Sequence, residues 1–369
     1  MTPGLRPIPL LVPDMPGTDA LLPWLRRIDG ARWYTNFGPL VREFESALSA
    51  CLDAEKPPGL VSVSNCTSGL ELSLLALGLP AGARVLVPSF TFVATATAVL
   101  RASCIPVAAD VDAQSWLLTP AIASEACKAR DIAAVMPVAT FGAPQDAAAW
   151  DRFAGDTGIP VVIDAAGAFG NQSVGARTIV VVSLHATKSL GIGEGGFVAA
   201  RDPAFLGEVR RLSNFGIQLP SGVVGLAGTN AKLSEYHAAV GMAALSRWPE
   251  RAGARRQLGA CYRSLLDLRC PKAKRQRRPD DGIYTIMAVR LPAGADTLSI
   301  MSSLQAANIE TRRWYHPLIP DHPGLRRTET TCDLACARSL SGQILGLPFH
   351  TSLSDEDIDR VCTVLAATL

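Results

Sequence analysis

The sequence lacks any apolar run long enough to cross a membrane, although its mean hydropathy is positive. A bilayer requires about 18 to 20 consecutive apolar residues, whereas Gly, Pro, Asp or Ser interrupts the longest apolar stretches of this chain. The Pro-rich beginning, MTPGLRPIPLLVPDMP, also lacks the compact apolar block of a signal peptide. We therefore expect a cytoplasmic protein without a membrane span.

A strong excess of charge of one sign is missing as well. The chain has 35 Lys and Arg against 33 Asp and Glu, a net charge of +2. Such a balance creates no overall field that would gather nucleic acid or anionic lipid, so neither partner is expected, while small anionic substrates remain possible. The nine cysteines form no CxxC pair and have no clustered His partners. Reduced thiols and the absence of a metal site are therefore expected.

What the sequence does contain is the composition and rhythm of a large α/β protein. Its 369 residues are 48% hydrophobic and 18% charged, which suits one large core and a smaller second one. From about residue 60 to residue 200, short β-branched runs alternate with Ala- and Leu-rich stretches, which predicts a mainly parallel buried sheet flanked by helices. Strands are expected over residues 60–64, 84–87, 105–111, 132–139, 159–164, 178–185 and 196–200, and helices over residues 68–77, 92–101 and 146–155.

The last third of the chain predicts a smaller unit. Residues 232–267 favour one or two long amphipathic helices, and the basic run 272–278 is interpreted as a solvated linker because it has no interleaved aromatics. A second domain should begin near Asp281. Its expected elements are strands over 283–291 and 309–315, a helix over 296–307, and a closing helix led by Ser354. We therefore divide the chain into residues 1–270, the N-terminal segment and large domain with its connecting helices, and residues 271–369, the small domain.

Open α/β sheets bind ligands at the carboxyl ends of their strands, so we expect the functional residues just after the predicted strands. In segment 64–69, SNCTSG, small hydroxyl residues open a helix. The free N–H groups and positive dipole end of such a helix suit a phosphate. An ordinary helix cap produces the same pattern, so both interpretations stay open at this point.

An apolar strand at 161–166 ends in one carboxylate, Asp164. A buried carboxylate must be paired or hydrogen-bonded, because an unpaired buried charge is very costly. Asp164 is therefore either a cap on the following turn or the counter-ion of a protonated pyridine nitrogen, which keeps such a ring electron-withdrawing.

Segment 183–188 places Lys188 directly after a valine-rich strand and ahead of a glycine-rich turn. Buried lysines pair or react, since desolvation lowers the pKa of the amine and favours the nucleophilic free base. His185 is the alternative catalyst in this segment. We interpret it as a packed, hydrogen-bonded neighbour, because no acid or base partner stands at a suggestive spacing.

The turn 191–196, GIGEGG, satisfies the GxGxxG pattern of dinucleotide sites. That fingerprint must open a helix after the first strand, whereas this turn leads into the predicted strand 196–200. A nicotinamide enzyme is therefore rejected, and the glycines are expected to let the chain turn closely beside a bound cofactor.

Together and in this order, these segments resemble the DegT/DnrJ/EryC1/StrS family of sugar aminotransferases that depend on pyridoxal phosphate (PLP). The resemblance implies the aspartate aminotransferase (type I) fold, an α/β fold with a large domain on a mainly parallel mixed sheet and a smaller C-terminal α+β domain. The similar segments span nearly the whole chain: 37–45, 88–95, 163–166, 183–188, 193–196, 228–235 and 347–350.

The resemblance also implies roles for individual residues. Lys188 corresponds to the lysine that carries PLP as a Schiff base and shuttles protons, and Asp164 to the partner of the pyridinium nitrogen. Phe92 corresponds to an aromatic that stacks on the cofactor ring. Asn230 corresponds to a residue that reaches the phosphate of the neighbouring subunit, which implies a homodimer with shared active sites. The phosphate is otherwise expected to contact Thr67, Ser68 and Ser183.

Two positions depart from the family pattern. Gly167 stands where Gln or His is usual, and the missing side chain leaves room or a water near the ring oxygen, which affects substrate orientation rather than cofactor binding. Lys232 stands where Arg is commoner, which keeps the charge but loses the fork geometry. Candidate substrate residues are Tyr34, Arg313, Tyr315 and His316.

The reaction that the resemblance implies moves an amino group, with glutamate as the expected donor, to a keto-sugar. A nucleotide-linked keto-deoxysugar of polysaccharide, glycan or antibiotic sugar biosynthesis is the expected acceptor. A keto-cyclitol acceptor remains open, because the cofactor site would be the same. A non-catalytic PLP-binding regulator is disfavoured by the intact Lys188 and Asp164. A related branch eliminates a sugar hydroxyl and carries His in place of the lysine, so Lys188 argues against it.

Overall fold

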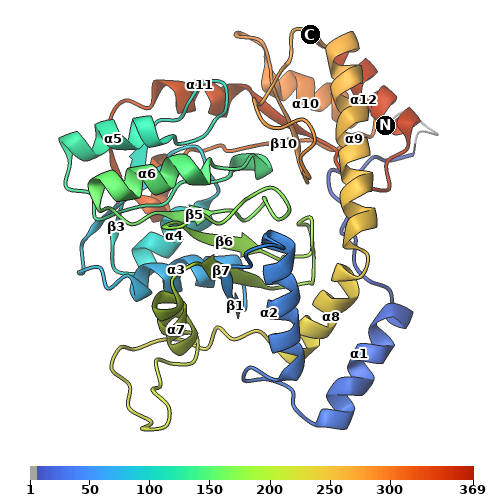
Figure 1. Ribbon diagram of the computed structural model, residues 1–369. Helices are drawn as coiled ribbons and strands as arrows, with labels where there is room; N and C mark the ends of the chain where they lie inside the picture. Colours follow the sequence, from blue (N-terminus) through green and yellow to red (C-terminus); the bar gives the residue numbers. More distant parts are fainter. Residues whose placement is uncertain (1–5) are drawn as a thin grey trace.

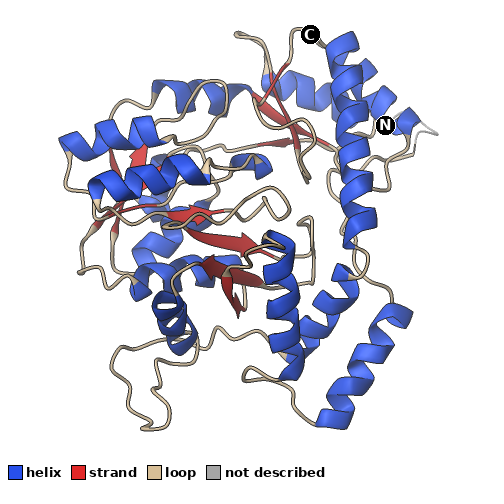
Figure 2. Cartoon of the chain, in the orientation of Figure 1, coloured by secondary structure: helices blue, strands red, loops and turns tan. Residues whose placement is uncertain are grey.

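The computed structural model describes residues 6–369, which form a central mixed sheet covered by helices on both faces and a smaller sheet beside it (Figure 1, Figure 2). The helices of the first part of the chain are α1 (Thr18–Ala31), α2 (Pro39–Leu52), α3 (Cys66–Ala76), α4 (Val93–Arg101), α5 (Pro120–Ala129), α6 (Ala147–Thr157), α7 (Pro203–Leu212), α8 (Glu235–Leu245) and α9 (Trp248–Arg269). The later helices are α10 (Thr297–Ala306), α11 (Ala335–Gln343) and α12 (Asp355–Ala366). Short 3₁₀ turns cover Thr140–Gly142, Ile319–Asp321 and Pro323–Leu325.

The central sheet is assembled from two hydrogen-bonded groups of strands. The order in one group is β1 (Gly59–Val63), β7 (Gly196–Ala200), β6 (Ile179–Ser183), β5 (Val162–Asp164). The order in the other is β4 (Ala134–Val135), β2 (Arg84–Pro88), β3 (Ile105–Ala109), β11 (Glu329–Thr330). Parallel bridges from Val135 to Val161 and from Val138 to Asp164 join β4 to β5. Since β7 alone is antiparallel to its neighbours, the predicted mainly parallel mixed sheet is confirmed.

Both faces of this sheet are buried. In β6, Val180 and Val182 belong to one core cluster, whereas Ile179 and Val181 belong to the other, as the two-residue period of a strand requires. Helices α2, α5, α6 and α8 cover the first face, and α3, α4 and α7 cover the second. Burial on both faces explains why the sequence of β6 is apolar without interruption.

The smaller sheet is antiparallel and packs against the C-terminal helices. Its order is β10 (Arg312–Arg313), β12 (Ile344–Leu347), β9 (Met287–Arg290), β8 (Lys274–Arg275). A separate core joins it to α9, α10 and α12 through residues such as Tyr262, Val289 and Val361. Ser354 caps α12 in a reciprocal capping box with Asp357, so the predicted helix start at Ser354 is confirmed.

Two predicted strands are shorter in the structure because prolines interrupt them. The strand expected over 132–139 is continuous only at β4, which ends two residues before Pro137, and the strand expected over 159–164 begins as β5 only after Pro160. Proline has no N–H to donate to the neighbouring strand. The strand expected over 309–315 likewise shortens to β10.

The interpretation of residues 272–278 as a solvated linker is wrong. Part of this run forms β8, which pairs with β9. Gln276, only 5% exposed, donates from Nε2 to the carbonyl oxygens of Ser115 at 2.7 Å and Thr140 at 3.1 Å. The segment is therefore bound to the large sheet's loops on one side and to the small sheet on the other.

The C-terminal part of the chain also contributes to the central sheet. β11 pairs in parallel with β3, with Glu329 opposite Val107. The Glu329 carboxylate accepts hydrogen bonds from Arg84 and Arg130 at 3.0 and 2.8 Å. A division of the chain at residue 270 stays a prediction, and β11 is one element beyond that residue that belongs to the larger sheet.

Three further features bear on the composition-based expectations. All nine cysteines are free thiols. Among residues 6–369, no helix combines the length and the apolar character that a membrane crossing demands. Within the same described range, no group of three or more His, Cys, Asp or Glu residues is arranged to hold a metal ion.

Candidate active site

A cavity of about 450 Å³ opens at the carboxyl ends of the central strands. It is bounded by the segments that follow β1, β2, β5 and β6 and by the segment that contains β10. This is where ligands bind in open α/β sheets. The structure brings six of the predicted site residues to its wall: Thr67, Phe92, Asp164, Ser183, Lys188 and Tyr315.

Asp164, the last residue of β5, is 4% exposed and held by hydrogen bonds. Its Oδ2 accepts from Thr95 Oγ1 at 2.8 Å, and its Oδ1 accepts from the backbone N–H of Ala166 at 3.2 Å. Burial raises the pKa of Asp164, while Thr95, Ala166 and the Lys188 charge oppose that rise. The carboxylate is therefore fixed in orientation and faces the cavity.

Lys188 follows β6 and is half-buried at the cavity wall. Among residues 6–369 its amine makes neither a hydrogen bond nor an ion pair. Burial lowers the pKa of Lys188, although the charges of Cys66 and Asp164 act in the opposite direction. The amine is thus a free base at lower pH than an ordinary lysine, as a nucleophile or a proton acceptor requires.

The glycine-rich segment after Lys188 forms a close turn, as expected. The carbonyl of Gly193, whose φ is +95°, accepts from the N–H of Ala186 at 2.8 Å. A Cβ atom at Gly191 would lie 2.4 Å from the carbonyl oxygen of Ala186. Any side chain at 191 would therefore displace the backbone that carries Lys188.

The N-terminus of α3 opens into the cavity, and its cap is Asn65. The Asn65 side chain accepts from the N–H of Ser68 at 2.8 Å, which places Thr67 and Ser68 in the first helical turn. Thr67 lines the cavity and Ser68 does not. Ser183 Oγ accepts from the N–H of His185 at 3.2 Å. The Thr67 and Ser183 hydroxyls and the helix end suit a phosphate.

Phe92 stands at the N-cap of α4, and 60% of its surface is exposed. Because Phe92 also lines the cavity, its ring is available to stack on a planar ligand.

The segment around β10 supplies a second aromatic wall. Tyr315 stacks on Phe141 with ring centres 5.3 Å apart, and both rings line the cavity. Arg312 and Trp314 also line it, whereas the predicted Arg313 and His316 do not. These two instead contact Ser341, Arg313 through the carbonyl oxygen at 3.5 Å and His316 through the hydroxyl at 3.0 Å. Successive strand residues point to opposite sides, so the cavity-facing arginine is Arg312.

Tyr34 and Asn230, two other predicted site residues, lie outside this cavity. Tyr34 is 44% exposed and stacks on Tyr236. Asn230 is exposed and forms a backbone bridge with Asn214, whose side chain accepts from Lys232 Nζ at 2.9 Å. The roles assigned to Tyr34 and Asn230 stay predictions.

Asn230 follows a loop that projects from the body of the molecule between α7 and α8 (Figure 1). We call residues 215–226 the apolar arm, since large hydrophobic side chains are exposed along it. They are Phe215, Leu219, Val223, Val224 and Leu226.

Sequence reasoning missed two contacts of the site. Thr95 orients Asp164 and is in turn 3.3 Å from the hydroxyl of Thr91, and no local sequence signal joins Thr95 to that distant carboxylate. His185 has a carboxylate neighbour after all, because Glu194 Oε1 lies 3.8 Å from its Nε2. His185 Nδ1 contacts Thr187 Oγ1 at 3.0 Å, so the expected hydrogen bonding of His185 is present.

This set of groups fits PLP. An unpaired amine with a lowered pKa suits the aldehyde, a fixed buried carboxylate suits the pyridine nitrogen, and a helix N-terminus with hydroxyls suits the phosphate. The exposed Phe92 ring suits the cofactor face.

Comparison with known proteins indicates a family of PLP-dependent enzymes. The DegT/DnrJ/EryC1/StrS aminotransferase family matches residues 19–366. A Mycobacterium tuberculosis protein, Protein Rv3402c, is 32% identical over 96% of this chain and 88% of its own length. The dTDP-4-amino-4,6-dideoxy-D-glucose transaminase of Shigella dysenteriae is 27% identical over 98% of both chains.

Solved structures show the same fold. A putative PLP-dependent aminotransferase from Bacillus cereus superposes with a TM-score of 0.92 at 26% identity, over 98% of this chain and all of that one (100%). DesI, solved in the presence of its TDP-sugar product, superposes with a TM-score of 0.87 at 31% identity, over 98% of this chain and 93% of that one. The expected type I aminotransferase fold is confirmed.

Proposed function

This chain belongs to the DegT/DnrJ/EryC1/StrS family of PLP-dependent aminotransferases, and we propose that it transfers an amino group from glutamate to a nucleotide-linked keto-sugar. The observation that carries the proposal is the meeting of Lys188 and Asp164 in one cavity with the cationic Arg312 at its wall. The dTDP-sugar and TDP-sugar named for two similar proteins support the acceptor class. The free thiols of all nine cysteines support a reducing, cytoplasmic location.

PLP, when bound, supplies an electron-withdrawing ring that stabilises negative charge beside the transferred nitrogen. In this proposal Lys188 holds the cofactor covalently and Asp164 faces its ring nitrogen. Phe92 covers the ring, and the phosphate is held by Thr67, Ser68 and Ser183. Burial raises the pKa of the Asp164 carboxyl, whereas Thr95, Ala166 and Lys188 lower it and so favour the charged form beside the ring nitrogen.

Lys188 also moves the proton in each half of the reaction. Its lowered pKa leaves the amine able to accept a proton from the donor's alpha carbon. The resulting ammonium would then give the proton to the carbon on the other side of the transferred nitrogen. The turn with Gly191 fixes the backbone that carries Lys188, and the amine acts in the same cavity as Asp164.

In this proposal the second aromatic wall orients the substrate. Arg312 is exposed within the cavity wall and its guanidinium lies 5.7 Å from the Trp314 ring centre. A guanidinium beside an indole suits an anionic group carried by a carbohydrate. Gly167 lines the same cavity without a side chain, and a Cβ there would meet Gly142 at an ordinary 3.5 Å. The missing side chain thus widens the acceptor space and is not required by packing.

We propose a homodimer with shared active sites as the working form. The apolar arm exposes Leu219 at 82% and Val223 at 56%, and exposed apolar patches mark contact surfaces. A second copy of the chain, docked on the arm, would cover these side chains and bring Asn230 toward the partner's cofactor phosphate.

The test is turnover with a small acceptor panel. Purified protein loaded with PLP is mixed with glutamate and either a dTDP-linked 4-keto-6-deoxyhexose or a keto-inositol, and 2-oxoglutarate is measured. We expect turnover with the nucleotide sugar and none with the Lys188→Ala variant. Turnover with the keto-inositol alone would replace the proposed acceptor by a cyclitol. Absence of 2-oxoglutarate with both acceptors, and with glutamate in a single turnover, would indicate a binding protein instead.

A further inference from the structure

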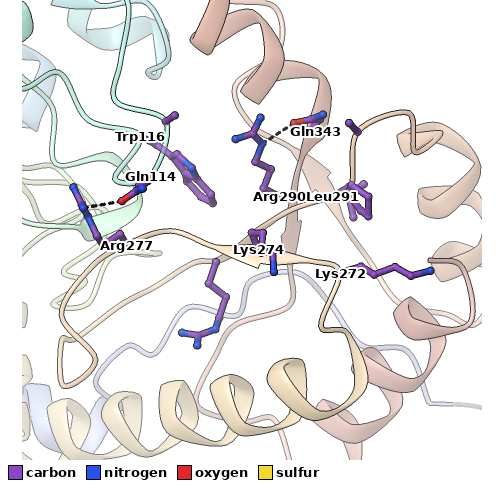
Figure 3. Close-up of a pocket in the computed structure, with 12 residues that line it drawn as sticks. Gln114, Trp116, Lys272, Lys274, Arg277, Arg290, Leu291 and Gln343 are labelled. Carbon is purple, nitrogen blue, oxygen red and sulfur yellow. Dashed lines mark hydrogen bonds between the residues drawn. The ribbon is translucent and has the colours of Figure 1, made fainter.

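A second cavity, of about 550 Å³, shares no lining residue with the active cavity. Its wall combines the loop after β3, the basic run that contains β8, the end of β9 and Gln343 at the end of α11. Figure 3 shows Trp116 reaching in from one side, with Lys274 and Arg290 on the segments that face it.

The wall of this second cavity carries positive charge only. No carboxylate belongs to the lining residues, which come from the described part of the chain. Two of its cations have acidic partners outside the wall: Arg275 is 2.9 Å from Asp267, and Arg277 is 3.7 Å from Asp112. The full set of lining cations is Lys272, Lys274, Arg275, Arg277 and Arg290.

Two of these cations have neutral hydrogen-bond acceptors alone. Lys274 Nζ donates to the carbonyl oxygen of Pro271 at 3.2 Å. Arg290 donates to Gln343 Oε1 at 2.6 Å and to Ser339 Oγ at 3.1 Å. Within residues 6–369 neither side chain makes an ion pair. Lys274 and Arg290 lie opposite each other in the β8–β9 pair, so two cations stand side by side and an anion that bridges them is favoured.

The cavity is also preformed. Gln276 fixes the basic run to the loops after β3 and β4 through two buried hydrogen bonds. Trp116, which is 1% exposed, forms a rigid floor and packs edge-on against Phe141 at 6.1 Å. Arg277 is held by Gln114 at 2.7 Å. A ligand would therefore meet cations that are already in place, which lowers the entropic cost of binding.

We propose that this cavity binds a small molecule that carries a diphosphate. Several cations at separate points match two linked phosphoryl groups better than one, and the guanidinium forks of Arg277 and Arg290 suit phosphate oxygens. A volume of about 550 Å³ suits a small ligand. Single-stranded nucleic acid instead needs an extended groove with exposed aromatic faces, and the face of Trp116 is covered. The proposal is independent of the amino-transfer reaction.

Binding is tested by calorimetry on the PLP-loaded protein, whose cofactor phosphate site is filled. The probes are inorganic pyrophosphate, UDP and a short single-stranded RNA. We expect pyrophosphate to bind once per chain, and the double variant Lys274→Gln with Arg277→Gln to weaken the binding of pyrophosphate and of UDP at this cavity at least about tenfold. Arg290→Gln should weaken them as well, and Lys274→Arg should retain binding. Tighter binding of UDP than of pyrophosphate would identify a nucleotide as the source of the diphosphate.

A matched control removes the same charge elsewhere. Arg326 and Arg327 are both exposed and line neither cavity, so the double variant Arg326→Gln with Arg327→Gln should bind like the unchanged protein. Equal weakening by both double variants would show that only overall charge matters and would overturn the proposal. If Arg312→Gln abolishes binding and the Lys274 and Arg277 variants do not, the ligand binds in the active cavity. If RNA binds more tightly than pyrophosphate, the ligand of this cavity is a nucleic acid and not a small molecule.

Discussion

Lys188 and Asp164 reach one cavity from the ends of two strands that pair in parallel, β6 and β5. Burial lowers the pKa of the amine and raises the pKa of the carboxyl, so it disfavours both charges. Each charge in turn favours the other. The protonation of Lys188 therefore depends on Asp164 as well as on burial.

This dependence predicts a pH profile for cofactor capture. Lys188 must lose its proton before it attacks an aldehyde, so capture rises with pH around a midpoint below the ordinary lysine value of 10.5. Asp164 raises the pKa of Lys188, so Asp164→Asn should move the midpoint further down. The measurement is the initial rate of PLP attachment to apoprotein, fixed with borohydride and located by mass spectrometry. A midpoint at or above 10.5, or attachment to another lysine, would contradict the assignment.

Thr95 provides a second prediction at this scale. Its hydroxyl donates to Asp164 and lowers the pKa of that carboxyl, so Thr95→Val, of similar shape, should let the pKa rise. With a higher pKa, the Asp164 carboxylate stabilises the proton on the ring nitrogen less strongly. We therefore expect kcat to fall roughly tenfold, about 1.4 kcal/mol, with the KM for glutamate nearly unchanged. Thr95→Ser should restore kcat. Thr97→Val, on the same helix, is the control, and an equal loss there would point to packing.

The residues that sequence predicts and those it misses differ in a physical way. Lys188 and Asp164 follow apolar strands, so strand periodicity and the cost of a buried charge suffice to place them. Thr95 contacts a carboxylate 69 positions away, and no local pattern encodes such a distance. The predicted substrate residue Arg313 lies next to Arg312, which lines the cavity, and neighbouring residues of a strand face opposite sides.

At the scale of elements, α2 and α8 are joined by one buried carboxylate. Glu235, the first residue of α8, is 2% exposed and accepts from the N–H groups of Leu40 and Val41, each at 2.9 Å. Gly38, the N-cap of α2, offers no capping side chain, and a Cβ there would lie 2.6 Å from Glu235 Cδ. The family segments 37–45 and 228–235, far apart in sequence, therefore meet as one capping interaction.

Removal of this cap should destabilise the protein. Glu235→Ala leaves two buried N–H groups without acceptors, and we expect a loss of about 2 kcal/mol in the free energy of unfolding. The midpoint of thermal unfolding should fall by roughly 2 to 4 °C. Glu235→Gln keeps one acceptor and should lose less. Glu250→Ala removes an exposed ion pair with Arg247 and should change little; equal effects of Glu235→Ala and Glu250→Ala would show that the cap is unimportant.

Element types were predicted more fully than element ends. Strands such as 84–87 and 196–200 were predictable because burial on both faces leaves an uninterrupted apolar run. The basic run 272–278 was not, because its outward-facing cations hide the inward-facing Gln276 that fixes it. Polar residues that make buried hydrogen bonds carry no hydrophobic signal for a strand.

At the scale of the whole molecule, shared active sites can be tested by mixing two inactive proteins. Lys188→Ala homodimers are mixed with Asn230→Asp homodimers, in which a carboxylate facing the phosphate should repel the cofactor. If Lys188 of one chain works with Asn230 of the other, each mixed dimer holds one doubly damaged site and one intact site. Random exchange makes about half of the dimers mixed, so activity should recover to about a quarter of the original value.

The control for this experiment is a pair of differently tagged chains, which report exchange by co-purification. Exchange without recovery of activity would show that Asn230 does not serve the partner's site. Leu219→Asp in the apolar arm should weaken the dimer and make activity depend on protein concentration, as sedimentation would show.

The position of β11 in the sequence affects the folding of the chain during its synthesis. Each other strand of the central sheet ends by residue 200, whereas β11 consists of Glu329–Thr330 and completes the edge beside β3. During synthesis on the ribosome, the nascent chain must therefore carry an open β3 edge while well over a hundred further residues are added. An open strand edge is a template for pairing with other chains. Nascent chains of this protein are expected to engage chaperones until Glu329 emerges.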